Sequence, residues 1–325
     1  IGNYKKVFEE ADTAFKKFKR GSALVVSGNT MSGDLADIIL DYVRMLFHID
    51  IIKFNTMLTT LRKNRDLLNR LYENIGYLDS MIGAASFREQ IDYYCEPRLV
   101  SGGKPYLKVE EVFHPLLEEP VVNSIDAGRS VLITGSNASG KSTFIKTMAI
   151  NTILSQTIYT SVSRSYEASY FRVFSSMALR DDIFSSESYY IVEIKSLKRI
   201  LDKIDEEIPV LCFVDEVLRG TNTLERIAAS TQILYSLSMG NALCFAATHD
   251  IELTHILDNY FDNYHFEEQV KEKDILFDYR LYNGRAVSRN AIKLLGIMGY
   301  SDDIIEKANN MANEFMKNGT WDLTS

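Results

Sequence analysis

Residues 131–143, VLITGSNASGKST, decide the fold of this chain. The first four residues of this stretch have the composition of a short buried strand. A loop over residues 135–140 follows, and after Lys141 the apolar spacing becomes helical. A strand, the pattern GxxxxGK[ST] and a helix in this order predict a phosphate-binding loop.

Each residue type in this loop suits the binding of phosphate. Gly135 and Gly140 let backbone N–H groups turn inward around phosphate oxygens, and the start of the helix adds its dipole. Lys141 supplies a cation to the β- and γ-phosphates, and Ser142 supplies a hydroxyl for Mg²⁺. We therefore expect a nucleotide to contact Gly135, Ser136, Asn137, Ala138, Ser139, Gly140, Lys141, Ser142 and Thr143.

Length and composition indicate a folded protein of about two domains. The chain has 325 residues, of which 46% are hydrophobic, and a formal net charge of -8. This composition supports a packed core and excludes wholesale disorder. The negative balance argues against a chain coated in DNA contacts, although a local basic patch is compatible with it.

The cysteines and the apolar runs indicate the compartment. Cys95, Cys212 and Cys244 have neither a metal-binding spacing nor an even disulfide set. We expect Cys212 and Cys244 to be reduced core residues, and hence a cytoplasmic location. The sequence has no signal peptide and no apolar run of ~18–20 residues, so it predicts no membrane segment. Because the first residue is Ile1, we expect a fragment of a longer protein.

The first part of the chain has the periodicity of helices. A basic amphipathic helix is predicted over residues 3–20 and ends at Gly21. Val25 and Val26 are expected in a brief strand or a buried loop. The first segment therefore predicts a helix whose basic face is solvated or, in the alternative interpretation, contacts nucleic acid.

A longer helical segment follows. Residues 35–75 keep helical apolar spacing without glycine or proline, which is typical of a lever or a coiled-coil arm. A second helix over residues 77–94 is expected after Gly76, either packed antiparallel to the first or continuing it after a kink. We therefore predict a helical lever or core region over residues 1–97, because Pro97 ends the helical pattern.

From residue 98 onward, strands and helices alternate. The predicted strands are 107–112, 131–134, a segment near 170–173, 210–214, 243–247 and 275–282. The predicted helices are 141–154, 189–203, 224–238, 251–255, 289–295 and 302–318. Apolar strands that alternate with helices predict an α/β domain over residues 98–325, with a parallel sheet covered on both faces.

Polar side chains follow two of these strands directly. Asp215 and Glu216 follow residues 210–214, and His249 comes shortly after residues 243–247. An aspartate at the end of a buried strand, beside the phosphate-loop strand, can hold Mg²⁺, and the next carboxylate can act as general base on water. His249 is placed as a sensor of the γ-phosphate. We therefore predict catalytic roles for Glu216, His249 and Lys141, and Mg²⁺ ligands at Ser142 and Asp215.

Four motifs together carry a resemblance to a known family. In order, GSNASGKST, DDIFSSESYYIVE, VLCFVDEVLRGTNT and FAATHDIEL resemble the ATPase domain of the MutS family, the ABC-class ATPases of DNA mismatch repair. The resemblance covers roughly residues 76–315, and the helices before it resemble the family's lever region in shortened form. It implies an ABC-class P-loop ATPase domain preceded by a long-helix α domain.

The resemblance also implies site residues and partners. Ser188 matches a signature serine that reaches the γ-phosphate of the other subunit's nucleotide, and residues 221–223, with Asn222, match a loop that crosses the dimer interface. Asp215 and Glu216 match the Walker B pair, and His249 matches the switch histidine. The implied partners are ATP, Mg²⁺ and a second copy of the chain, with composite ATP sites and slow hydrolysis that moves helical arms on DNA.

The sequence departs from the family pattern in three places. The signature reads Ser-Tyr-Tyr from Ser188, with the acidic Glu187 where a basic residue is usual. Residues 119–123 hold no aromatic side chain, so we expect adenine to rest on Val121 and Val122. Nothing in the chain resembles the family's mismatch-reading domain, so we expect weak, salt-dependent duplex binding without preference for mismatches.

Two other interpretations fit the same residues. One is a binding clamp in which ATP occupancy matters and turnover is nearly absent. The other is an ABC-class ATPase tethered to a membrane or a protein partner through whatever precedes the sequence. Turnover distinguishes an enzyme from a clamp, because Glu216→Gln should matter greatly only to the enzyme.

Overall fold

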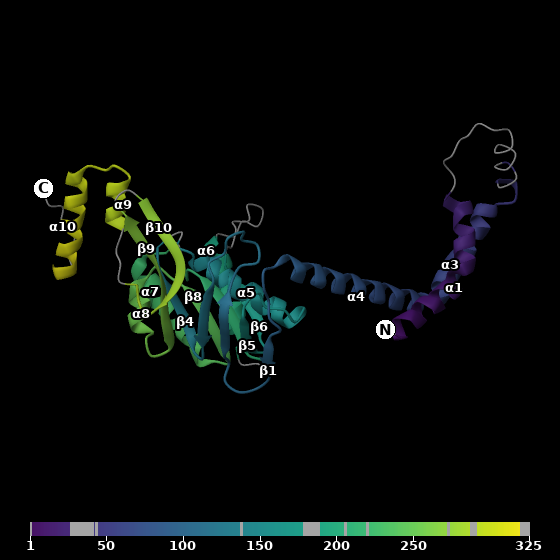
Figure 1. Ribbon diagram of the computed structural model, residues 1–325, viewed down its shortest axis with the longest axis horizontal. Helices are drawn as coiled ribbons and strands as arrows, with labels where there is room; N and C mark the ends of the chain where they lie inside the picture. Colours follow the sequence, from purple (N-terminus) through teal and green to yellow (C-terminus); the bar gives the residue numbers. More distant parts are fainter. Residues whose placement is uncertain are drawn as a thin grey trace. The chain divides into compact units, whose positions relative to one another are not determined.

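The computed structural model describes residues 2–26, 42, 45–136, 139–177, 189–204, 207–218, 221–271, 274–286 and 291–318. The chain divides into two compact units, Ile1–Gln90 and Ile91–Ser325, and most of their elements are labelled in Figure 1. The sequence placed the boundary near residue 98, whereas the structure divides the chain where the last helix of the first unit ends.

The first unit contains α1 (Gly2–Val26), α3 (Ile49–Lys63) and α4 (Arg65–Gln90). Helix α1 packs against both of the others. It buries Val7, Ala11 and Phe15, which recur every four residues and therefore share one face. Tyr4 of α1 stacks on Tyr77 of α4, with ring centroids 5.7 Å apart. This unit is held together by one apolar face of α1.

The predicted end of the first helix is wrong. Helix α1 continues through Gly21 to Val26, where the sequence suggested an end followed by a strand or loop. A single glycine inside a helix costs only about 1 kcal/mol, so an apolar face packed on two neighbouring helices tolerates it.

The continuous helix predicted over residues 35–75 is also wrong, because the structure has a break at Asn64 instead of near Gly76. Asn64 separates α3 from α4: its φ of -111° departs from helical values, and its side-chain amide donates to the carbonyl oxygen of Thr60. Helix α4 then runs through Gly76 without interruption, so the separate helix predicted over residues 77–94 is wrong. Residues 27–41, 43 and 44, which include most of the start of the predicted lever, lie outside the described residues.

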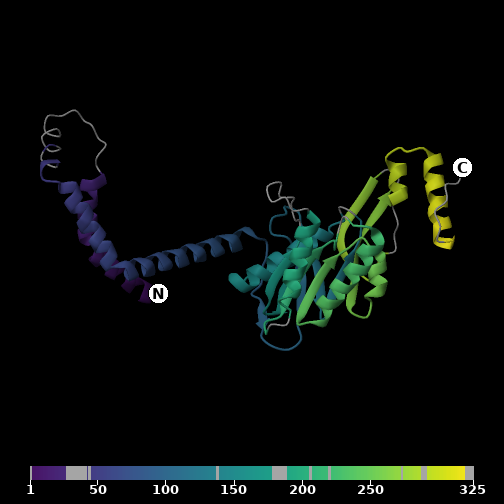
Figure 2. The ribbon, with the colours of Figure 1, turned by 180° about the vertical axis from the view of Figure 1, so that it is seen from behind.

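Six strands form the main sheet of the second unit, in the order β10-β9-β4-β8-β7-β6. They are β4 (Ser130–Thr134), β6 (Arg172–Ser176), β7 (Val210–Asp215), β8 (Ala242–Ala247), β9 (Phe261–Lys271) and β10 (Asp274–Asn283). The strands from β9 to β6 run parallel, and β10 forms an antiparallel hairpin with β9, seen at one edge of the sheet in Figure 1 and Figure 2. The predicted α/β class is confirmed. Because β8 separates β4 from β7, the expectation that the Asp215 strand lies beside the phosphate-loop strand is wrong.

A second sheet has four strands in the order β1-β5-β2-β3. They are β1 (Arg98–Val100), β2 (Leu107–Val112), β3 (Asn123–Ala127) and β5 (Ser165–Ser169). Of these, only β2 was predicted. The others are short and polar at alternate positions, and β9 in the main sheet was missed because it carries several charged residues. A continuous apolar run indicates a strand that is buried on both faces, so these shorter or more polar strands lack that signal.

Helices cover both faces of the main sheet. These helices are α5 (Lys141–Thr157), α6 (Tyr189–Leu201), α7 (Thr223–Met239) and α8 (Ile251–Ile256). Later in the chain, α9 (Ala291–Ile297) and α10 (Asp302–Asn318) pack against each other. Val131 and Ile133 of β4 pack toward α5 and the second sheet, whereas Leu132 packs toward α6, α7 and α8. The main sheet is therefore the middle of three layers, as its apolar strands predict.

Two cysteines lie side by side in the main sheet. Cys212 of β7 and Cys244 of β8 are register partners, fully buried and not in a disulfide. The hydrogen bond with Cys212, together with burial, raises the pKa of the Cys244 thiol well above its ordinary value. Their placement agrees with the predicted reduced core residues. Among the described helices, none combines the length and apolar character needed to cross a membrane.

Asn151, a fully buried residue of α5, fixes this helix against the second sheet. Its side-chain amide donates to the carbonyl oxygens of Phe113 at 3.3 Å and Thr147 at 3.0 Å, and its carbonyl accepts from the backbone N–H of Val162 at 2.6 Å. Phe113 directly follows β2. The bonds therefore hold the segment after β2 beside the first turns of α5.

Asn151→Ala should lower the free energy of unfolding by about 3 kcal/mol, because Phe113 and Val162 would lose buried hydrogen-bond partners. Urea unfolding followed by circular dichroism measures this change. The control is Thr157→Ala in the same helix, whose exposed hydroxyl donates to the carbonyl oxygen of Ile153 and should change stability by less than about 0.5 kcal/mol. Equal losses in the two variants would contradict the role of Asn151.

Candidate nucleotide-binding and hydrolysis site

The loop between β4 and α5 has the backbone that the sequence predicts. Gly135 and Gly140 have φ angles of 147° and 108°, which L side chains rarely adopt. A Cβ atom on Gly135 would lie 2.9 Å from the carbonyl oxygen of Phe266 and from Oγ of Ser139. Only glycine fits there, so the loop is a narrow backbone turn. Asn137 and Ala138 lie outside the described residues.

Lys141 is the buried cation of this loop. Its Nζ donates to the carbonyl oxygens of Gly135 and Ser136, both at 2.7 Å. Burial lowers the Lys141 pKa to about 8, although the nearby carboxylates of Glu216, Asp215 and Glu268 act in the opposite direction. The ammonium is therefore poorly solvated, and a phosphate anion would satisfy it better than two neutral carbonyls.

Two serine hydroxyls of the loop also lack a partner. Oγ of Ser136 and Oγ of Ser139 are buried, and neither makes a hydrogen bond within the part of the chain that the structure describes. A buried hydroxyl without a partner costs about 1–3 kcal/mol. Both atoms lie in the loop that would surround phosphate, so a bound anion with acceptor oxygens would satisfy them. Ser142 is half-buried and Thr143 exposed at the start of α5.

Acidic and imidazole side chains meet at the carboxyl ends of β7 and β8. Asp215 is the last residue of β7. Glu216 donates its backbone N–H to Ala247, and its Oε1 lies 3.0 Å from Nε2 of His249. The Glu216 backbone is left-handed, with φ of 58°. The structure thus brings Glu216 and His249 into direct contact at the carboxyl ends of β7 and β8, of which β8 pairs with β4.

A small cavity lies behind this pair. Its volume is about 230 Å³, and it is lined by Glu216, Val217, Arg226, Thr248, His249 and Asp250. Arg226 of α7 donates two hydrogen bonds, of 2.9 and 2.6 Å, to the carboxylate of Asp250. The hydrogen bond with Asp250 raises the pKa of the Arg226 guanidinium above its ordinary value. This pair fixes the segment that carries His249 against α7.

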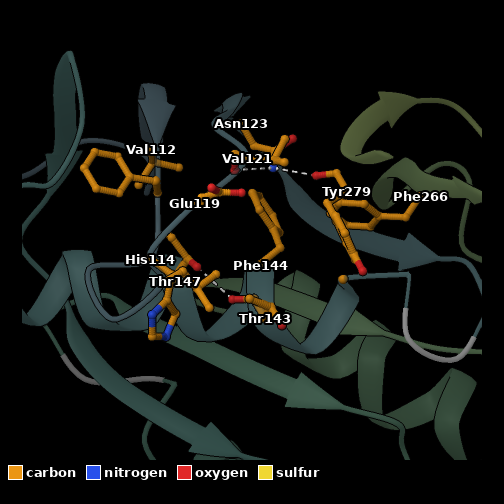
Figure 3. Close-up of a pocket in the computed structure, with 13 residues that line it drawn as sticks. Val112, His114, Glu119, Val121, Asn123, Thr143, Phe144, Thr147, Phe266 and Tyr279 are labelled. Atoms are coloured by element: carbon orange, nitrogen blue, oxygen red, sulfur yellow. Dashed lines mark hydrogen bonds between the residues drawn. The ribbon is translucent and has the colours of Figure 1, made fainter. Parts of the chain in front are cut away.

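A second cavity, of about 360 Å³, opens beside the phosphate loop. Figure 3 shows that its side chains come from distant segments: Val112, His114, Glu119, Val121, Asn123, Thr143, Phe144, Thr147, Phe266 and Tyr279. Burial, followed by the charge of Lys146, lowers the pKa of His114 and favours its neutral form. An apolar, aromatic pocket next to a phosphate loop suits the base of a nucleotide.

Tyr279 lines this cavity but was not among the candidate residues that the sequence indicated. The sequence predicted that adenine rests on Val121 and Val122, and of the two only Val121 lines this cavity. Tyr279 belongs to β10 and has a left-handed backbone, with φ of 55°, inside a register shift of the β9–β10 hairpin. No local pattern near residues 119–123 could have indicated it, because it lies about 160 residues later in the chain.

Asn123 connects this bulge to the pocket. Its side-chain amide donates to the carbonyl oxygen of Tyr279 at 3.0 Å, and its carbonyl accepts from the N–H of Leu281 at 2.7 Å, as Figure 3 shows for Tyr279. A Cβ atom on Gly140 would lie 3.2 Å from the Tyr279 ring. The second glycine of the loop therefore also makes room for this aromatic ring.

The predicted subunit-bridging residues were expected at the site of a second chain, so their role there stays a prediction. Asn222 is described, and its side-chain oxygen accepts a hydrogen bond from the N–H of Leu224 at 2.9 Å and caps α7. Ser188 lies outside the described residues, so its contact with a partner's nucleotide stays a prediction.

The Lys141 environment predicts how triphosphate binding depends on pH. In the free protein the Lys141 pKa is about 8, and bound phosphates raise it. Below this value the ammonium is already charged, so ATP affinity should be highest there and should fall toward tenfold per pH unit above it. Calorimetry between about pH 7.5 and 9.5 measures the slope. Lys141→Arg, which stays charged, should show a flatter profile, and an equal slope would contradict this assignment.

Comparisons with known proteins agree with this geometry. The family model described as MutS domain V matches residues 131–316. DNA mismatch repair protein MutS of Thermotoga petrophila is 27% identical over 277 residues, which are 82% of this chain and 34% of that protein. MutS protein homolog 4 of Mus musculus is 31% identical over 268 residues, which are 76% of this chain and 27% of that protein. The chain thus spans about a third of the length of these curated relatives. Because the family model matches residues 131–316, more than half of the sequence, this chain belongs to the MutS family.

Proposed function

We propose that this chain binds ATP with Mg²⁺ and hydrolyses it at the carboxyl ends of the inner strands of the main sheet. One observation carries the proposal: the buried Lys141 ammonium, hydrogen-bonded to two loop carbonyls, lies near the contacting pair Glu216 and His249. The phosphate loop holds the triphosphate, and the aromatic cavity with Tyr279 holds the adenine. Membership of the MutS family supports an ATPase of this kind.

The residues present suit Mg²⁺. Ser142 and Asp215 offer a hydroxyl and a carboxylate, and hard oxygen ligands of this kind, completed by water and phosphate oxygens, are those that Mg²⁺ prefers. When bound, the ion neutralises charge on the phosphate oxygens.

Glu216 is placed for the hydrolytic step. Its carboxylate takes a proton from a water molecule whose oxygen attacks the γ-phosphorus, and the bond to the β-phosphate oxygen breaks to leave ADP and phosphate. His249 contacts the same carboxylate at 3.0 Å and so fixes its direction. Lys141 stabilises the negative charge that spreads over the phosphoryl oxygens.

We further propose that two chains form composite sites. In this arrangement Ser188 and residues 221–223 of one chain complete the site of the other, and the helices α1, α3 and α4 move with the dimer as a lever. The name of the Thermotoga petrophila relative, which specifies DNA mismatch repair, supports a role in DNA handling. The chain's net charge of -8 restricts duplex contact to local basic segments such as α1.

A second candidate function is an ATP-dependent clamp on a protein partner. The observation that favours it is the apolar surface of the helical unit: Ile52, Phe54 and Ile82 are 61%, 58% and 65% exposed. Such surfaces bind proteins more readily than phosphate backbones. In this case the chain would bind ATP and turn it over little.

Glu216→Gln should reduce ATP turnover at least ~100-fold and leave ATP binding within a few-fold of the parent, because it removes only the general base. Lys141→Ala should abolish binding, because it removes the cation from the phosphate loop. Phosphate release and calorimetry measure the two effects. The control is Glu207→Gln, which changes an exposed carboxylate just before the start of β7 and should leave both quantities as in the parent. Unchanged turnover in Glu216→Gln would contradict the enzyme and favour the clamp.

Duplex binding provides a separate test of DNA handling. The chain should bind duplex weakly, with affinity that falls as salt rises and with no preference for a G·T mismatch, because phosphate contacts carry no sequence information. Fluorescence anisotropy on matched and mismatched duplexes at two salt concentrations measures this. A tenfold preference, about 1.4 kcal/mol, would place mismatch reading within these residues. No binding at low salt would favour a protein partner.

A further inference from the structure

Glu193 is a buried carboxylate in a stripe of apolar residues. It lies in α6 and is 2% exposed. Leu197 and Ile200, four and seven residues later, share its helix face and lie in the core against the main sheet. An acidic side chain at such a position is costly unless it makes a specific hydrogen bond. We therefore expect this carboxylate to accept a hydrogen bond from a specific partner.

The partner of Glu193 is the turn that carries Glu216. Oε1 of Glu193 accepts a short hydrogen bond from the backbone N–H of Leu218. Leu218 and Glu216 have φ angles of 57° and 58°, so the turn has two non-glycine residues in the left-handed region. Such backbones persist only where the surroundings determine them. Glu193 is one of the groups that determine this one.

Two other hydrogen bonds hold the same turn. The backbone N–H of Glu216 donates to Ala247 of β8, and the fully buried hydroxyl of Ser230 in α7 donates to the carbonyl oxygen of Val217 at 3.2 Å. The turn is therefore fixed on three sides, by a strand and two helices. Of these three contacts, only that of Glu193 comes from α6.

We propose that Glu193 is a positioning residue for Glu216, and that through it α6 sets the direction of the hydrolytic carboxylate. This inference rests on the proposed function of Glu216. The hydrogen bond fixes the left-handed backbone at Leu218, and the backbone fixes the Glu216 side chain beside His249. Because α6 begins at Tyr189, directly after Ser188, a displacement of this helix is passed to Glu216.

Two substitutions separate the hydrogen bond from the charge. Glu193→Asp keeps the charge but shortens the side chain, so it should withdraw the acceptor from Leu218. Glu193→Gln keeps an acceptor oxygen at full length and removes the charge. We expect kcat to fall at least tenfold in Glu193→Asp, with KM and the calorimetric Kd for ATP within twofold, whereas Glu193→Gln should stay within threefold of the parent. Glu207→Asp is the control for shortening an exposed carboxylate.

Parental kcat in Glu193→Asp, or an equal loss in Glu193→Gln, would overturn the proposal. If Glu193→Asp does not fold, Ser230→Ala tests the same turn: it should lower kcat with little change in KM, and an unchanged kcat would overturn the idea that the turn positions Glu216.

Amide hydrogen exchange at Leu218 keeps this inference distinct from the proposed function. Protection of that amide should be lost in Glu193→Asp and retained in Glu193→Gln, whether or not the chain hydrolyses ATP. A parent without turnover would contradict the proposed function alone, whereas an equally protected Leu218 amide in Glu193→Asp would contradict the positioning role.

Discussion

The buried ammonium of Lys141 is the interaction on which the rest of the site depends. It is held by the carbonyl oxygens of Gly135 and Ser136, inside a loop that only glycine at position 135 can close. Burial destabilises its charge and lowers its pKa to about 8. A free energy cost of this kind is retained where a binding partner relieves it. The loop, the start of α5 and the carboxylates at the strand ends are arranged around this one cation.

The three-layer core explains how distant residues reach that cation. Alternate residues of β4, β7 and β8 pack into separate cores on the two faces of the sheet, so the strands are fixed in register and their carboxyl ends lie together. Asp215, Glu216 and His249 follow those ends. The second sheet, tied to α5 by Asn151, supplies one wall of the aromatic cavity, and the β9–β10 hairpin supplies Tyr279.

Local pattern predicted the parts of the site that are contiguous in sequence. The phosphate loop, the apolar strand before Asp215 and helix α10 could be predicted because each has one strong period or motif. Tyr279 could not, because a bulge and the side chain of Asn123 bring it to the loop from a distant hairpin. The helix end at Asn64 lies in a non-helical backbone at that one residue, while the apolar spacing continues past it. Glu193 is the last residue of the motif DDIFSSESYYIVE, but its contact with Leu218 depends on packing between distant segments and has no local sequence signal.

Calorimetric titration of the parent chain with ATP and with inorganic tripolyphosphate, both with Mg²⁺, tests the central claim most directly. The account assigns the phosphates to the loop around Lys141 and the base to the cavity of Tyr279. It predicts saturable binding of one ATP per chain, and tripolyphosphate that competes for the same site with an affinity at least ~10-fold weaker, because it cannot fill the aromatic cavity. Absence of saturable ATP binding, or tripolyphosphate that binds as tightly as ATP, would contradict the account.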